Sequence, residues 1–291
     1  MRVLSLALLL VSGLGSAYMG PEAPRPIVVL VHGRGHLGQD TAVLRREWKR
    51  DLDSSLKLVG MPPLRDGDVR LAWYADVLDP DSDSLCGSIP VTSDSLGFAD
   101  VARGFLALLS SAVPAEDSRE VRGLIGDLLY ALDAAKRCAA ERRVGSAIDA
   151  ALRERRPVIV VAYSLGSLVT YGYLQSQVPS VGSGNLRLVT VGSPLGVRVI
   201  RDLVFGESSE RLRVPNGVAG WENVYDPNDF LSAPLEGVLS AASVRDRPTH
   251  ASERDDPHSL ARYLRDRATG AAVMRALCES TRNEYAACAT L

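Results

Sequence analysis

The length, composition and charge of the chain limit the kinds of protein it can be. It has 291 residues, of which 46% are hydrophobic and 23% are charged, and its formal net charge is -2. This length fits one α/β domain that carries an insertion. The chain has no large basic excess and only 5% aromatic residues, which argues against nucleic acid as a partner.

Residues 1–17 have the pattern of a secretory signal peptide. Arg2 supplies the positive charge, and a short apolar run followed by small residues supplies the other two parts of such a signal. We therefore predict that residues 18–291 form the mature domain and that the protein is secreted or periplasmic. Translation from Met19 would instead give a cytoplasmic protein. The apolar run is too short for a membrane-spanning helix.

The four cysteines, Cys86, Cys138, Cys278 and Cys288, agree with export. Their number is even, and none belongs to a C-x-x-C pair of the metal-binding type. Cys278 and Cys288 flank a short polar stretch, so we predict a local disulfide there and a second one between Cys86 and Cys138. The sequence leaves the connectivity open, and four reduced cysteines in a cytosolic enzyme are the alternative.

The sequence of the first half of the chain predicts a strand, a helix and a second strand, in that order, followed by a mostly helical segment. The first helix would bury Val43, Leu44, Trp48 and Leu52 on one face. An Asp-, Ser- and Gly-rich loop then leads into three further helices. In chain order these elements are strand Pro26–Val31, helix Thr41–Leu56, strand Val69–Tyr74, loop Asp79–Gly97, and helices Phe98–Ser111, Arg119–Arg137 and Gly145–Arg155.

The second half predicts three more strands, and the alternation with helices predicts a mostly parallel sheet covered on both faces. The segment of about residues 79–137 then forms a helical insertion, which we expect to act as a lid or pocket wall. The elements are strand Val158–Val161, a helix after Ser164, strands Leu186–Val191 and Trp221–Tyr225, a charged loop Val244–Pro257, and a helical region from His258 to about Cys278.

The segment Ala162-Tyr163-Ser164-Leu165-Gly166 stands where a buried strand changes to a helix. It differs from the nucleophile pattern G-x-S-x-G by one methyl group, since alanine replaces the first glycine. A sharp strand-to-helix turn exposes the serine hydroxyl, as a nucleophile requires. The simpler interpretation is a serine that caps the following helix.

Five segments taken together resemble the α/β-hydrolase superfamily, and more specifically its bacterial lipase- and esterase-like members. The similarity covers nearly the whole mature chain and implies the fold of that superfamily, with a helical lid. The order of serine, aspartate and histidine in the chain also matches. The segments are PIVVLVHGRG, VIVVAYSLGS, LRLVTVGSPLG, WENVYDPNDFLS and DDPHSLARYL.

The resemblance implies Ser164 as the nucleophile, with an acid and a base chosen from two candidates each. Asp229 is favoured because an apolar pair follows it, and Asp226 is the alternative that suits a turn. His258 is favoured because it opens the last predicted helix, and His250 is the alternative in a loop. The oxyanion donors would be the backbone N–H groups of Leu165 and Arg34; His32 and His36, beside the first strand, suit a different role.

The function that the resemblance implies is hydrolysis of carboxylic esters through an acyl-enzyme on Ser164. No metal and no organic cofactor is expected. The expected partner is a small-molecule or lipid ester, and a lipid substrate would bring transient contact with a membrane surface. Acyl transfer, thioester cleavage and peptide cleavage by the same residues are alternatives, as is a catalytically silent binding protein. The sequence predicts no oligomeric state.

Overall fold

The protein is described by a computed structural model that covers most of the chain. The described residues are 24–79, 81–82, 86, 130–176, 185–206, 212–239, 244–250, 256, 258–281 and 285–290. The predicted signal peptide and the alternative start at Met19 lie outside them. Most of the predicted insertion at 79–137 also lies outside them, including helix Phe98–Ser111.

The six strands of the described residues form one parallel sheet in the order β2–β1–β3–β4–β5–β6. Strands β1 and β3 are apolar without alternation, as expected where helices cover both faces. The strands are β1 Ile27–Val31, β2 Val69–Ala72, β3 Val158–Tyr163, β4 Leu186–Val191, β5 Val218–Tyr225 and β6 Val244–Pro248.

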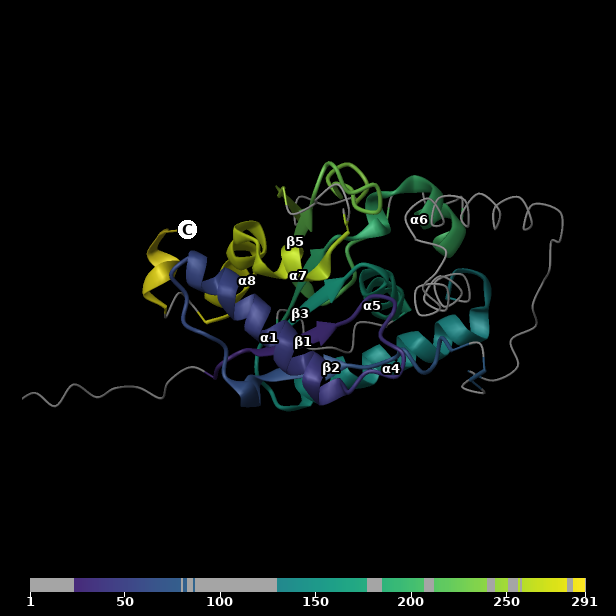
Figure 1. Ribbon diagram of the computed structural model, residues 1–291, viewed down its shortest axis with the longest axis horizontal. Helices are drawn as coiled ribbons and strands as arrows, with labels where there is room; N and C mark the ends of the chain where they lie inside the picture. Colours follow the sequence, from purple (N-terminus) through teal and green to yellow (C-terminus); the bar gives the residue numbers. More distant parts are fainter. Residues whose placement is uncertain are drawn as a thin grey trace, which may run out of the picture.

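Helices cover both faces of the sheet (Figure 1), so the architecture is a three-layer α/β arrangement. One layer contains α1, α7 and α8, and the other contains α4, α5 and α6. The helices are α1 Thr41–Leu58, α4 Ala134–Arg153, α5 Leu165–Ser176, α6 Arg198–Phe205, α7 Leu260–Arg265 and α8 Arg267–Ser280. Three 3₁₀ turns accompany them: η1 Asp66–Asp68, η2 Pro194–Gly196 and η3 Ala286–Thr290.

Strand β1 shows how the two cores are built. Its side chains alternate between the faces, with Val28 and Leu30 packed toward α1 and α8, and Val29 and Val31 packed toward α4 and α5. All four side chains are fully buried. A single strand therefore contributes to both hydrophobic cores, which holds its carboxyl end firmly between the two helical layers.

The prediction of a charged loop at Val244–Pro257 is wrong for its first part. Val244–Pro248 is strand β6, which pairs with β5. The sequence did not indicate this strand, because its arginines suggested a solvent-exposed loop. In the fold Arg245 donates to a carboxylate oxygen of Glu222 at 3.1 Å, and Arg247 donates to the other oxygen. Glu222 is only 4% exposed, and its carboxylate pairs with both arginines. These ion pairs allow two arginines to lie in a strand.

The predicted division of the central helices is also wrong. Helix α4 begins at Ala134, because the Asp133 carboxylate accepts the N–H groups of the first turn and so caps it. The predicted helix to Arg137 is therefore interrupted, and the start expected at Gly145 lies inside α4. In helix α1, Val43 was predicted on the buried face but is 39% exposed.

The predicted helical region from His258 to Cys278 consists of two helices. His258 lies in a turn before α7. The helical conformation is interrupted at Asp266, and α8 begins at the next residue. The Asp266 carboxylate accepts the Ala268 N–H at 2.7 Å, which caps the new helix. His258 is therefore held by a turn and not by helical geometry.

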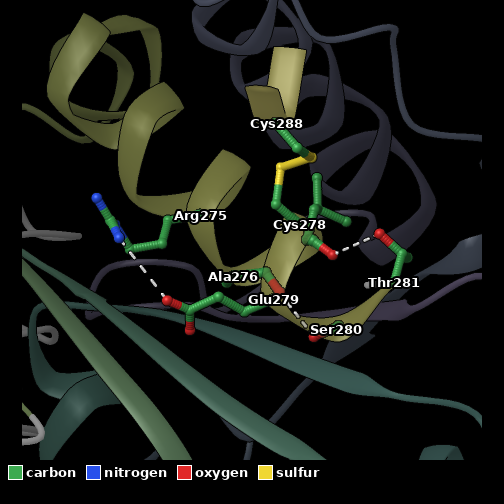
Figure 2. The surroundings of a disulfide bond; sticks show 8 residues. Arg275, Ala276, Cys278, Glu279, Ser280, Thr281 and Cys288 are labelled. Carbon is green, nitrogen blue, oxygen red and sulfur yellow. Dashed lines mark hydrogen bonds and ion pairs between the residues drawn. A yellow bond between two sulfur atoms is a disulfide. The ribbon is translucent and has the colours of Figure 1, made fainter. Parts of the chain in front are cut away.

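Both predicted disulfides are present, Cys86–Cys138 and Cys278–Cys288. Figure 2 shows the second bridge, which joins the last turn of α8 to Cys288 in η3. Two disulfides favour an oxidising compartment. Within the described part of the chain, no helix combines the length and the apolar character needed to cross a bilayer.

Candidate functional site

Ser164 occupies a strained turn at the carboxyl end of β3. Strand β3 ends at Tyr163, helix α5 begins at Leu165, and Ser164 between them has a φ of 51°. This left-handed conformation is uncommon for a residue with a side chain, and such strain gathers at functional sites. The Ser164 N–H donates to the Val191 carbonyl of β4 at 3.0 Å, which anchors the turn to the sheet.

Gly166 is the residue that makes this turn sterically feasible. A Cβ at Gly166 would lie 2.3 Å from the His32 carbonyl oxygen and 2.8 Å from that of Val31. The first turn of α5 therefore lies directly against the end of β1. Ala162, which replaces the first glycine of the common pattern, is fully buried in β3. Its methyl group is accommodated in the core.

Ser164, His258 and Asp229 form a continuous hydrogen-bonded chain. The Ser164 Oγ lies 2.7 Å from His258 Nε2, and His258 Nδ1 lies 2.6 Å from Asp229 Oδ2. Since a carboxylate only accepts, Nδ1 carries the hydrogen and Nε2 is left to accept the serine proton. Asp229 is 1% exposed, so this chain of contacts lies inside the protein.

The two alternative residues do not join this chain. The Asp226 carboxylate accepts the Asn228 N–H at 2.9 Å, as expected of a turn former. His250 is exposed and lines a separate surface hollow with Asp256 and Arg262. The structure thus brings together the three favoured residues and leaves both alternatives outside.

Tyr263 is a further contact of Asp229, and the sequence analysis did not include it among the candidate site residues. Its hydroxyl donates to Asp229 Oδ2 at 2.7 Å, while the Leu231 N–H donates to Oδ1 at 3.0 Å. Burial raises the pKa of Tyr263 strongly, and the nearby Asp229 charge adds to the effect. The phenol therefore stays protonated and remains a donor.

Tyr163 contacts the histidine, and the sequence interpretation had missed it as well. Its ring stacks on the His258 imidazole with centroids 5.1 Å apart and an angle of 25°. Its hydroxyl donates to the backbone carbonyl of His258. Burial raises the pKa of Tyr163 well above its ordinary value. The only signal in the sequence was an aromatic hydroxyl directly before the serine.

The two predicted oxyanion donors lie beside Ser164. Leu165 is the first residue of α5, where a backbone N–H has no acceptor within the helix. Arg34 follows Gly33 in the loop after β1, and it lines the same pocket as Ser164 and Leu165.

His32 fixes the loop that carries Arg34. It is fully buried, its Nδ1 lies 2.6 Å from the Gly33 carbonyl oxygen, and its Nε2 accepts the Tyr74 N–H at 3.1 Å. The ring also stacks on Tyr74, with centroids 4.2 Å apart. Burial, with a smaller contribution from His36, lowers the pKa of His32 to about 3. His32 is therefore a neutral structural residue, and it lies outside the hydrogen-bonded chain of Ser164, His258 and Asp229.

A small pocket lies next to Ser164. Its walls are mostly apolar and come from α5, η2, α6 and the loop after β5, together with the short segment before α4. Such a surface suits an apolar group bound beside the reactive hydroxyl. The lining residues are Arg34, Tyr130, Ala131, Ser164, Leu165, Leu168, Pro194, Ile200, Val204 and Leu231.

Comparison of the chain with protein-family models, with curated proteins and with solved structures finds no match. Among the described residues, no group of three or more His, Cys, Asp or Glu side chains is arranged to bind a metal ion. The site itself offers a hydroxyl, an imidazole nitrogen that can take its proton, and a buried carboxylate behind the imidazole.

Proposed function

We propose that this protein is a serine hydrolase of the α/β-hydrolase type that cleaves carboxylic esters. The observation that carries the proposal is the hydrogen-bonded chain Ser164–His258–Asp229, which ends at an apolar pocket. The left-handed turn at Ser164 supports it, as does the order of the three residues after β3, β5 and β6. A serine that only capped α5 would not need this histidine and carboxylate.

In the proposed reaction, Ser164 Oγ attacks the ester carbonyl carbon while His258 Nε2 takes its proton. The carbonyl oxygen becomes negative and is stabilised by the Leu165 and Arg34 N–H groups. Asp229 stabilises the imidazolium, which then protonates the departing alcohol. The acyl group remains on Ser164 until water, deprotonated by His258, attacks the ester. The carboxylic acid leaves and Ser164 regains its proton.

The pocket supports an apolar acyl group as the part of the substrate nearest to Ser164. Its walls carry aliphatic side chains, among them Leu168, Ile200 and Val204. We propose that the insertion at about residues 79–137 covers this pocket as a lid. The proposed setting is outside the cytoplasm, which the two disulfides support. A lipid ester would be reached at a membrane surface.

Covalent labelling with a fluorophosphonate tests the proposal directly. Wild-type protein should gain the mass of one phosphonyl group on Ser164, and Ser164→Ala should gain none. Labelling without turnover of any p-nitrophenyl ester would indicate another acyl substrate, such as a thioester or amide. A wild-type protein that is not labelled at all would contradict the proposal and favour a binding role.

Two pairs of matched substitutions test the acid and the base. We expect Asp229→Asn and His258→Ala to lower kcat for p-nitrophenyl butyrate about a thousandfold or more, because each removes a member of the proton-transfer chain. Asp226→Asn and His250→Ala should stay within about tenfold of wild type. The opposite pattern would mean that the wrong carboxylate and histidine had been assigned.

A further inference from the structure

We propose that the hydroxyl groups of Tyr163 and Tyr263 are positioning groups, one for the base and one for the acid. This inference depends on the proposed function, because it concerns the rate of that reaction. It does not follow from the pattern of serine, aspartate and histidine, which includes neither tyrosine. The two residues act from different elements, since Tyr163 ends β3 and Tyr263 lies in α7.

Tyr263 and His258 donate to the same oxygen of the acid. The single hydrogen of the phenol goes to Asp229 Oδ2, which His258 Nδ1 approaches to 2.6 Å. The Leu231 N–H holds the other oxygen, Oδ1. The carboxylate thus has three donors and cannot rotate without losing some of them. Tyr263 fixes the direction from which Asp229 faces the imidazole.

The position of Tyr263 is itself determined by the turn that carries the acid. Its oxygen accepts the Asp226 N–H at 3.1 Å and lies 3.0 Å from the Ser232 Oγ. Because the phenol hydrogen is used on Asp229, the phenol oxygen can only accept in its contacts with these two groups. The Tyr263 side chain therefore contacts both ends of the turn, Asp226 and Ser232. This arrangement also explains why Asp226 and Ser232 lie close to the site without belonging to it.

Tyr163 connects the base to the nucleophile. It immediately precedes Ser164, and its hydroxyl donates to the His258 carbonyl while its ring stacks on the imidazole. Trp48 contacts the same ring in a T-shaped arrangement, with centroids 6.2 Å apart. A single rigid residue therefore sets the position of His258 relative to the backbone of Ser164. The distance of 2.7 Å between Ser164 Oγ and His258 Nε2 depends on this contact.

Neither tyrosine lines the pocket beside Ser164. A substrate in that pocket would therefore contact neither hydroxyl. Loss of either hydroxyl should disturb the alignment of the reacting groups and leave substrate binding intact. The expected signature is a lower kcat at constant KM.

The test uses Tyr163→Phe and Tyr263→Phe, each of which removes one hydroxyl and keeps the ring. Helix α5 offers a matched control for each. The Tyr173 hydroxyl donates to the Asp149 carboxylate at 2.6 Å, as Tyr263 does to its carboxylate. The Tyr171 hydroxyl donates to the Arg213 backbone carbonyl at 3.1 Å, as Tyr163 does to its carbonyl. Tyr173→Phe and Tyr171→Phe thus remove the same types of bond elsewhere.

We expect kcat for p-nitrophenyl butyrate to fall by roughly tenfold to a hundredfold in Tyr263→Phe and roughly tenfold in Tyr163→Phe. KM should stay within about twofold, and the two control variants should keep wild-type kcat. The rate of fluorophosphonate labelling should fall in parallel with kcat. Unchanged kcat in both site variants, or an equal fall in the controls, would overturn the inference.

These measurements distinguish a failure of the positioning role from a failure of the proposed function. A wild-type protein that neither hydrolyses esters nor reacts with the fluorophosphonate contradicts the function itself. An active wild type with unaffected tyrosine variants contradicts only the positioning role. If a phenylalanine variant does not fold, a ring-fluorinated tyrosine at that position keeps the shape and changes the donor strength. A change in kcat at constant KM then supports the role, and an unchanged kcat overturns it.

Discussion

The buried imidazole of His32 should make the protein less stable at acidic pH. Its pKa is lowered from 6.5 to about 3, chiefly by burial and further by His36, whose ring centroid lies 5.3 Å away. The unfolded chain would bind a proton here below pH 6.5, whereas the folded chain would not until about pH 3. The stabilisation from a neutral His32 is therefore complete above pH 6.5 and is lost progressively as the pH falls toward 3.

The size of this effect follows from the two pKa values. A pH of 5 is about 1.5 units below the unfolded-state pKa of 6.5. Protonation of His32 in the unfolded state therefore lowers the stability of the fold by about 2 kcal/mol relative to pH 8. His32→Asn removes the titrating group and keeps an N–H near the position of Nδ1, which contacts the Gly33 carbonyl. We expect this variant to be less stable than wild type at pH 8. Its loss of stability between pH 8 and pH 5 should be smaller by about 2 kcal/mol.

Urea unfolding with the disulfides intact, followed by tryptophan fluorescence at both pH values, measures this difference. His250→Asn is the matched control, because that side chain is exposed and its surroundings change little on unfolding. Proton NMR of the His32 ring gives a second measurement that does not depend on a variant. An equal pH effect in wild type and His32→Asn would refute the reasoning, as would ring signals of His32 that titrate between pH 8 and pH 5.

Gly166→Ala should unfold the protein or prevent its expression in soluble form, because the new methyl group would meet the His32 carbonyl oxygen at 2.3 Å. Circular dichroism would check this, and a variant as stable as wild type would show that α5 can move away from β1. Replacing Cys278 and Cys288 together by serine should lower the free energy of unfolding by about 3 kcal/mol, since the bridge closes a loop with a sequence separation of 10. Unreduced mass spectrometry should show four hydrogens fewer than the reduced chain, and free thiols would contradict both bridges.

The central strands could be predicted from the sequence because their signal is local. Val158–Val161 is apolar without alternation and β-branched, which is typical of a strand covered on both faces, and Leu186–Val191 is a mostly apolar run that ends at a Gly-Ser-Pro turn. The serine turn was equally visible, since a strand pattern changed to a helix pattern at one residue. The Cys278–Cys288 disulfide was expected because its cysteines flank a short polar stretch, and Cys86 with Cys138 followed as the remaining pair. The strands, the serine turn and the Cys278–Cys288 bridge depend on neighbours in the chain, which a sequence displays.

The features that the sequence did not reveal depend on residues far apart in the chain. Strand β6 was hidden because Arg245 and Arg247 appear solvated until Glu222 of β5 is placed beside them. The contacts of Tyr263 with Asp229 and of Tyr163 with His258 join residues 34 and 95 positions apart. A tyrosine that packs and a tyrosine that orients a reacting group have the same local pattern.

The disulfide between Cys86 and Cys138 has a consequence for how the chain behaves when it is cut. The bridge joins residues with a sequence separation of 52, so the chain between them is a covalently closed ring. A protease that cleaves one peptide bond inside this ring cannot release a fragment, since both new ends remain attached through sulfur. A nicked molecule would migrate as one band without reductant and as two bands with it. One such cut would leave the chain in a single covalent piece.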